Sequence, residues 1–112
     1  MGSVASLFPG ADREMYPSTK KFVEYLSNAF HYRFGSDIDY VVTKPGFVET
    51  KMTNFRSGRG CCNSMECVKG AMLALGNTNE TYGAKNHVVL GRFIESYTWM
   101  FPPKVANVFL HI

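Results

Sequence analysis

The strongest constraint on the fold is a long helical pattern that is followed at once by a short apolar strand pattern. Apolar residues recur at spacings of three and four between Phe22 and Phe34, and Pro17 suits the first turn of a helix. This predicts an amphipathic helix from Pro17 to Phe34. Residues 38–43, Ile-Asp-Tyr-Val-Val-Thr, are rich in β-branched and aromatic side chains and predict a buried strand. Helix, tight turn and strand make half of a βαβ unit, so we predict an α/β fold with a parallel sheet.

The rest of the chain predicts shorter elements. Pro9 and Gly10 break any periodicity before the first helix, and Gly76 suits the end of a second helix that Ser64 would cap. In chain order we expect a loop over 7–16, a short helix over 48–54, a loop over 55–63, a helix over 64–75, a polar turn over 77–83, a strand over 87–90, an aromatic helix over 93–101 and an apolar tail over 105–110.

Length and composition set a ceiling on this fold. The chain has 112 residues, of which 46% are hydrophobic and 19% charged, which suits one small globular domain and argues against a disordered segment. A dinucleotide-binding sheet with helices on both faces needs two βαβαβ halves, and a chain of this length supplies about one of them.

Charge, cysteines and hydropathy exclude several classes of function. The formal charge is +3 and the basic residues are scattered, so we expect no nucleic-acid partner. Cys61, Cys62 and Cys67 have no Cys-x-x-Cys spacing and no histidine close by in sequence, so we expect neither a disulfide framework nor a metal site. No run of about 18 apolar residues and no basic leader is present, so we expect no membrane span and no signal peptide.

Tyr16 and Lys20 are the first candidates for chemistry. They stand four residues apart at the start of the predicted helix, so their side chains project from one face, one turn apart. An ammonium about 4–6 Å from a phenol favours the phenolate and lowers the tyrosine pKa from its ordinary value of about 10. Such a tyrosine can give a proton to a carbonyl oxygen while hydride reaches the carbon. A pair this short is by itself a weak signal.

Two further features stand in the order that this chemistry needs. Ser3 precedes Tyr16 by thirteen residues, at the predicted end of a strand, where a hydroxyl can orient the carbonyl. Residues 45–50, Pro-Gly-Phe-Val-Glu-Thr, follow the predicted strand at the point where ligands bind in open α/β sheets. The serine, the tyrosine–lysine pair and this segment rarely occur together in this order.

With these residues the sequence resembles the short-chain dehydrogenase/reductase family. The match is carried by Ser3, by Tyr16-Pro17-Ser18-Thr19-Lys20 and by Pro45-Gly46-Phe47-Val48-Glu49-Thr50. The resemblance implies that Ser3 positions the substrate carbonyl, that Tyr16 is the general acid/base, and that Lys20 lowers its pKa and holds the nicotinamide ribose. It also implies that the nicotinamide and its carboxamide are bound by Pro45, Gly46, Val48 and Thr50.

Within that family the sequence looks most like the microsomal branch, the very-long-chain 3-oxoacyl-CoA reductases and 17β-hydroxysteroid dehydrogenases. The likeness is carried by Ser6-Leu7-Phe8-Pro9, residues 16–23 and the run from Cys67 to His87, and the aromatic end is similar to the tail of those enzymes. It implies a lipid-like carbonyl substrate, NADP(H) as cofactor with NAD(H) as the alternative, and association with the endoplasmic reticulum membrane.

The family's cofactor-binding motifs have no counterpart in this sequence. Gly58-x-Gly60-x-x-Asn63 follows no predicted strand and is interpreted as loop glycines. We therefore expect the C-terminal half of a Rossmann-like doubly wound parallel sheet that lacks the N-terminal cofactor-binding strands. Residues 1–83 would be its catalytic-side remnant and residues 84–112 an aromatic-rich extension. Such a half should be marginally stable and should not bind NADP(H) tightly alone.

Three functions remain open at this point. The chain is a truncated reductase that needs a cofactor half, or a non-catalytic interaction or assembly module, or a small domain with Tyr16 and Lys20 on its surface. In the first two, the helix from Pro17 to Phe34 would contact a second copy or a complementing half. For residues 93–101, core packing is favoured over contact with a membrane surface.

Overall fold

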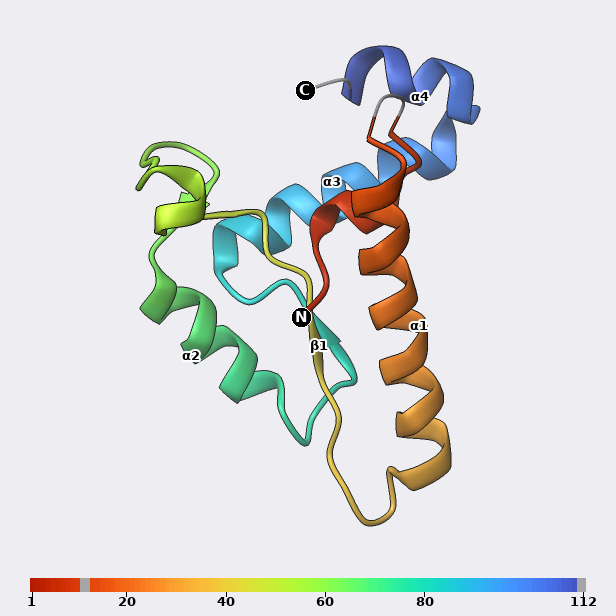
Figure 1. Ribbon diagram of the computed structural model, residues 1–112, viewed down its shortest axis with the longest axis vertical. Helices are drawn as coiled ribbons and strands as arrows, with labels where there is room; N and C mark the ends of the chain where they lie inside the picture. Colours follow the sequence, from red (N-terminus) through yellow and green to blue (C-terminus); the bar gives the residue numbers. More distant parts are fainter. Residues whose placement is uncertain (11–12, 111–112) are drawn as a thin grey trace.

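The computed structural model describes residues 1–10 and 13–110 (Figure 1). Its radius of gyration is 14.4 Å, against about 13 Å for a compact domain of this length, so the fold is slightly open. In chain order the elements are the 3₁₀ helix η1 (Val4–Leu7), α1 (Met15–Phe34), β1 (Val42–Thr43), β2 (Phe47–Val48), the 3₁₀ helix η2 (Lys51–Thr53), β3 (Cys61–Cys62), α2 (Ser64–Ala74), β4 (Glu80–Thr81), α3 (Lys85–Met100) and α4 (Pro103–Leu110).

The strands form two short parallel pairs. β1 pairs with β4, with Val42 opposite Glu80, and β2 pairs with β3, with Phe47 opposite Cys61. The helix α2 connects β1 to β4, which is the crossover that parallel pairing requires. The α/β class with parallel pairing is therefore confirmed, and each of the two sheets has two strands.

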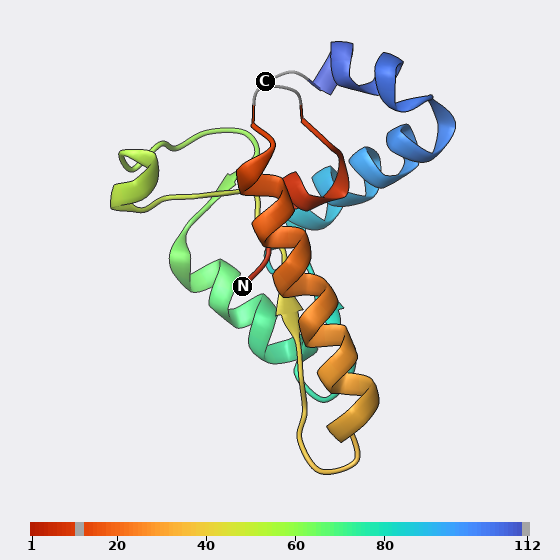
Figure 2. The same cartoon turned by 45° about the vertical axis from the view of Figure 1, so that its right-hand side comes forward.

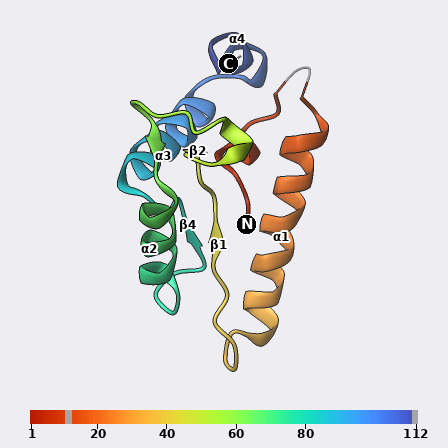
Figure 3. The same cartoon turned by 60° about the vertical axis from the view of Figure 1, so that its left-hand side comes forward.

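The N-terminal segment extends the β1–β4 pair on its other side. The Gly2 amide donates to the Thr43 carbonyl at 2.8 Å, and the Val4 amide donates to the Pro45 carbonyl at 3.2 Å. Both partners advance together along the chain, so the segment runs parallel to β1. In a regular parallel ladder the amide of residue 45 would donate back to the N-terminal segment. Pro45 has no amide hydrogen, so this bond is absent and the ladder ends there. Figure 3 shows the N-terminus on the side of β1 away from β4.

The long helix forms where the periodicity predicts it. α1 ends at Phe34 as expected and begins two residues early, so that Tyr16 lies in its first turn. Figures 1 and 3 show α1 and α2 on opposite sides of β1. The predicted strand over 38–43 is confirmed only at Val42 and Thr43, which are buried, whereas Ile38 is 53% exposed. The reason is that β4, the strand opposite, is itself two residues long.

α1 turns its polar side toward the strands. Glu24 is its one buried residue among those described, while Phe22 is 66% exposed and Leu26 38% exposed. Glu24 and Asn28 follow Tyr16 and Lys20 at intervals of four, so the four side chains share a face. The predicted apolar stripe of this helix lies largely on the outside.

The second helix is capped one residue earlier than predicted. Asn63 is the N-cap in place of Ser64, because its Oδ1 accepts from the Glu66 amide at 2.8 Å while the Glu66 carboxylate accepts from the Asn63 amide at 3.2 Å. Gly76 follows the helix with φ of 80°, as a residue beyond a helix end often does.

The C-terminal part is helical where a strand was predicted. Residues 87–90 lie within α3, because His87, Gly91 and Ile94 form one buried face at helical spacing. The predicted tail over 105–110 belongs to α4, which doubles back over α3 (Figure 2). The predicted turn over 77–83 contains β4, and the predicted loop over 55–63 contains β3.

Candidate functional site

The Tyr16–Lys20 pair is formed in the first turns of α1. The Lys20 Nζ lies 5.6 Å from the centre of the Tyr16 ring, and it is also 3.5 Å from the Met1 carbonyl oxygen. Tyr16 is 45% exposed. The predicted spacing therefore does bring the ammonium onto the tyrosine ring, and the phenol remains accessible to a ligand.

Ser3 caps the 3₁₀ helix η1. Its Oγ accepts from the Ala5 amide at 3.2 Å, and the residue is buried. Among the described residues no acceptor for its hydroxyl hydrogen is within hydrogen-bond distance. We call Ser3 and η1, residues 3–7, the Ser3 turn. The cap uses an oxygen lone pair of the Ser3 hydroxyl and leaves its hydrogen without an acceptor among the described residues.

The structure brings three predicted site segments to one place. The Val4–Pro45 bond fixes the Ser3 turn beside the residues that follow β1, and the Lys20–Met1 contact joins the residues just before the turn to the first turns of α1. Because the N-terminal segment and β1 run in parallel, these residues lie at the carboxyl ends of both. In open α/β sheets this is the edge that binds ligands.

The predicted cofactor-binding residues have close neighbours within the chain. A Cβ on Gly46 would meet the His87 ring at 3.1 Å, so the missing side chain makes room for His87. Thr53 Oγ1 donates to the Val48 carbonyl at 2.6 Å and accepts from the Thr50 amide at 3.2 Å. Pro45 is buried. Pro45, Gly46, Val48 and Thr50 therefore pack against or bond to other parts of the chain, whereas Tyr16 is 45% exposed.

A charge cluster of Glu24, Lys44 and Glu80, of which Glu24 and Lys44 are buried and Glu80 is partly exposed, lies under α1; no local sequence pattern predicted it. The Lys44 Nζ is 2.7 Å from Glu80 Oε2 and 3.6 Å from Glu24 Oε1, and the Lys44 side chain is only 3% exposed. The same ammonium lies 5.1 Å from the centre of the Tyr82 ring. The one signal that could have found it is the position of Glu24, four residues after Lys20 on the same helix face.

Hydrogen bonding decides the protonation of this cluster. Burial alone would raise the pKa of Glu80, but hydrogen bonds from Lys44 and Asn28 lower it to below its ordinary value. Glu80 is therefore a carboxylate at neutral pH, and it balances the buried ammonium of Lys44.

His87 and Cys62 form a second buried pair. The His87 side chain is fully buried, and its Nε2 lies 3.1 Å from the Phe47 carbonyl and 3.2 Å from the Gly60 carbonyl. Since carbonyls only accept, Nε2 carries hydrogen, and Nδ1 accepts from Cys62 Sγ at 3.7 Å. Burial, with Cys67 adding to it, raises the pKa of Cys62 to about 11. Cys62 is therefore a packed thiol and no nucleophile at neutral pH.

Tyr82 is a buried tyrosine and a poor proton donor. Burial and a hydrogen bond donated to Glu95 raise the pKa of Tyr82 well above its ordinary range. Cys61, Cys62 and Cys67 are free thiols, and no group of three His, Cys, Asp or Glu side chains in the described part of the chain is arranged to hold a metal ion.

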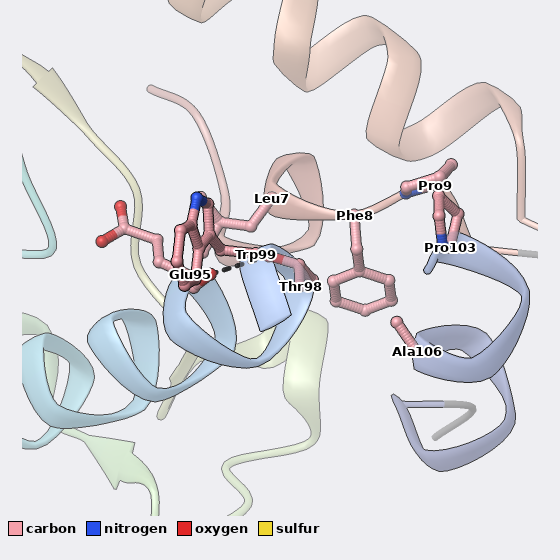
Figure 4. A pocket seen from close by; sticks show the side chains of 8 residues that line it. All are labelled: Leu7, Phe8, Pro9, Glu95, Thr98, Trp99, Pro103 and Ala106. Atoms are coloured by element: carbon pink, nitrogen blue, oxygen red, sulfur yellow. Dashed lines mark hydrogen bonds between the residues drawn. The ribbon is translucent and has the colours of Figure 1, made fainter. Parts of the chain in front are cut away.

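An apolar pocket of about 380 Å³ adjoins the Ser3 turn. Figure 4 shows Leu7, Phe8 and Pro9 on one side of it and residues of α3 and α4 on the other. The Thr98 hydroxyl is bonded to helix carbonyls, as its dashed line to Glu95 indicates, so the polar lining is already satisfied. The lining residues are Leu7, Phe8, Pro9, Glu95, Thr98, Trp99, Pro103 and Ala106.

Comparison with known proteins gives one relationship. The chain is 30% identical over 92 residues to the Caenorhabditis elegans protein named "Putative steroid dehydrogenase 3". The aligned residues make up 80% of this chain and 29% of that protein. The chain thus spans less than a third of the length of the curated relative it matches. No family model and no solved structure matches the chain.

This similarity indicates a dehydrogenase-like relationship. Within the described residues no helix combines the length and the apolar character that crossing a bilayer requires.

Proposed function

We propose that this chain is the proton-transfer part of a short-chain dehydrogenase/reductase that interconverts a carbonyl and an alcohol with NADP(H), or alternatively NAD(H). In this proposal Ser3 orients the carbonyl oxygen, Tyr16 exchanges a proton with it, and Lys20 holds the nicotinamide ribose. Pro45, Gly46, Val48 and Thr50 support the nicotinamide. The glycine-rich turn for the pyrophosphate would come from outside these residues, so the chain alone should bind the nucleotide weakly.

One observation carries this proposal: the Ser3 turn, the Tyr16–Lys20 pair and Pro45 lie together at one edge of parallel strands. The Lys20–Met1 and Val4–Pro45 contacts hold them there. The parallel strands follow the order N-terminal segment, β1 and β4, and along the chain α1 connects the first two and α2 precedes the third. The C-terminal half of a doubly wound parallel sheet would have this order. The similarity to a protein named as a steroid dehydrogenase supports the same reading.

The proposed chemistry uses the hydroxyls of Tyr16 and Ser3. A bound reduced nicotinamide would supply hydride to the carbonyl carbon. The Tyr16 hydroxyl is exposed enough to donate its proton to the oxygen as negative charge develops there. The Ser3 hydroxyl, whose hydrogen lacks an acceptor among the described residues, can donate to the same oxygen.

We further propose a lipid-like substrate, a 3-oxoacyl-CoA or a keto-steroid. The pocket beside the Ser3 turn supports this, because Leu7, Phe8 and Trp99 give it apolar walls. Association with the endoplasmic reticulum membrane would use the exposed aromatic side chains of α3, of which Trp99 is 87% exposed and Phe93 63% exposed. Residues 1–83 would form the catalytic part and 84–112 the extension.

The second candidate is an assembly module without catalysis. It is favoured by the outer side of α1, where Phe22, Tyr25 and Leu26 are exposed on a helix whose inner side is polar. This face would contact a second copy or a complementing half. Such contacts are compatible with the reductase, so only turnover separates the two candidates.

The test is a chimera in which this chain replaces the matched segment of the Caenorhabditis elegans relative. NADPH consumption with 3-oxoacyl and keto-steroid substrates is followed by absorbance. Tyr16→Phe should lower turnover at least about 100-fold, since general acid catalysis contributes that much, and should leave circular dichroism unchanged. Tyr32→Phe, near the other end of the same helix and 83% exposed, is the matched control and should keep full turnover. Equal turnover in the two variants would remove Tyr16 from the mechanism.

A further inference from the structure

We propose that Glu24 is a positioning residue that fixes the Ser3 turn against the helix carrying Tyr16 and Lys20. The proposal rests on the proposed function, because it concerns the distance between the hydroxyl that orients the carbonyl and the phenol that protonates it. It adds to that function a residue with no direct part in the reaction.

The link runs through one serine hydroxyl. Ser6 Oγ lies 2.8 Å from Glu24 Oε2 and 2.8 Å from the Ser3 carbonyl oxygen. The hydroxyl has one hydrogen, and the Ser3 carbonyl already accepts from the Ser6 amide at 3.1 Å. The carboxylate is the stronger acceptor, so Ser6 donates to Glu24. Glu24 thereby holds Ser6, which belongs to η1, and Ser3 is the N-cap of the same short helix.

The carboxylate is itself fixed. Its other oxygen, Oε1, is 3.0 Å from Lys21 Nζ and 3.6 Å from Lys44 Nζ. Glu24 is 5% exposed and Lys44 3% exposed, so the contact between them is largely shielded from water, whereas the Lys21 side chain is 58% exposed. Because both carboxylate oxygens have bonding partners, the Glu24 side chain links α1 to the residue that follows β1 and to the Ser3 turn.

Few other hydrogen bonds join α1 to this part of the chain. Among the described residues, the side chains of α1 that hydrogen-bond to residues 1–7 are Glu24 and Lys20, and Lys20 reaches only the Met1 carbonyl at 3.5 Å. Glu24 follows Tyr16 by two helical turns on the same face. Loosening Glu24 should therefore let the Ser3 turn move relative to Tyr16 while α1 stays whole.

The first test uses the full chain and needs no catalysis. Amide hydrogen exchange is measured by NMR for wild type, Ser6→Ala, Glu24→Ala, Glu24→Gln and Glu80→Gln. Ser6→Ala and Glu24→Ala should speed exchange of the amides of residues 5 and 6 about tenfold or more relative to those of α3. Glu24→Gln keeps an acceptor oxygen for Ser6 and should restore much of the protection.

Glu80→Gln is the matched control, because it removes a carboxylate from the same lysine without touching Ser6. If the amides of residues 5 and 6 exchange no faster in Ser6→Ala than in Glu80→Gln, the proposal is overturned. Ser6→Ala leaves every charge in place, so it gives this answer even where Glu24→Ala does not fold.

The second test uses the chimera described above. Ser6→Ala should lower kcat about tenfold with KM within about twofold, since substrate binding is kept and alignment is lost. Faster exchange with unchanged kcat would also overturn the positioning role. Failure of the reductase proposal is recognised separately, by unchanged turnover in Tyr16→Phe.

Discussion

At the scale of single residues, buried charge joins α1 to the strands where apolar contacts would be expected. Lys44 is nearly inaccessible and is compensated by Glu80 and Glu24, and Asn28 adds a bond of 2.7 Å to Glu80. Breaking such a cluster by removing one partner leaves an uncompensated buried charge, which is strongly destabilising. Substitutions that remove one member of the cluster should therefore loosen the packing of α1 on the strands.

The lowered pKa of Glu80 predicts a dependence of stability on pH. Unfolded glutamate has a pKa of about 4.3, so a carboxyl whose pKa is lower in the folded state stabilises the fold above that pH, and this contribution is lost as pH falls through the folded value. Glu80→Gln should therefore cost stability at pH 6 and less at pH 3.5, by urea unfolding of both proteins. An equal cost at both pH values would contradict the assignment.

At the scale of elements, small residues let α2 approach the loop after β4. A Cβ on Gly70 would lie 2.1 Å from the Gly83 carbonyl oxygen, a distance that no side chain tolerates. Cys67 and Ala74, on the same side of α2, are buried, while Met72 and Leu73 are exposed. The close contact therefore depends on the absence of a side chain at residue 70.

This contact predicts an inverted effect of alanine. In an exposed helix interior, Gly→Ala stabilises by about 1 kcal/mol, but at Gly70 the clash should make Gly70→Ala destabilising by about 1–3 kcal/mol. Thermal and urea unfolding measure the difference. Lys69→Ala, at the exposed neighbouring position, is the control and should stay within about 0.5 kcal/mol of wild type. A stabilised Gly70→Ala protein would show that α2 is not held close to Gly83.

Local patterns predict some elements and miss others for physical reasons. The periodicity of α1 and the cap of α2 are local signals, so both helices were predicted with boundaries within two residues. β4 has two residues and forms by pairing with β1 across α2, so nothing local marks it within a polar turn. Residues 87–90 of α3 form a short apolar run, which favours neither the helical nor the strand period, and the strand predicted there is wrong.

The residues of the candidate site also include some whose contacts follow from local spacing and others whose contacts are long-range. Tyr16 and Lys20 are four residues apart, and helix geometry alone brings them together. The contact between Glu24 and Lys44 joins a helix to the end of a strand, and the roles of Gly46 and His87 depend on how α3 packs. These are long-range contacts, which a single sequence does not encode in any local pattern.

At the scale of the whole molecule, large apolar side chains face outward on both helices that flank β1. Phe22 and Tyr25 of α1 and Met65 and Met72 of α2 are each more than 60% exposed. Such surfaces usually mark contact with another protein or another part of one. This agrees with the proposal that the chain works together with a nucleotide-binding part.

If these residues complete a site for hydride and proton transfer, the chimera should move hydride from the nicotinamide to the carbonyl carbon. This is measured by mass spectrometry of the alcohol formed from a 3-oxoacyl or keto-steroid substrate and NADPH deuterated at the transferring position. We expect one deuterium on the carbinol carbon, in wild type and Tyr32→Phe, and almost no product in Tyr16→Phe. Absence of deuterated alcohol from the folded wild-type chimera, or its undiminished formation by Tyr16→Phe, would show that these residues do not carry out the reaction.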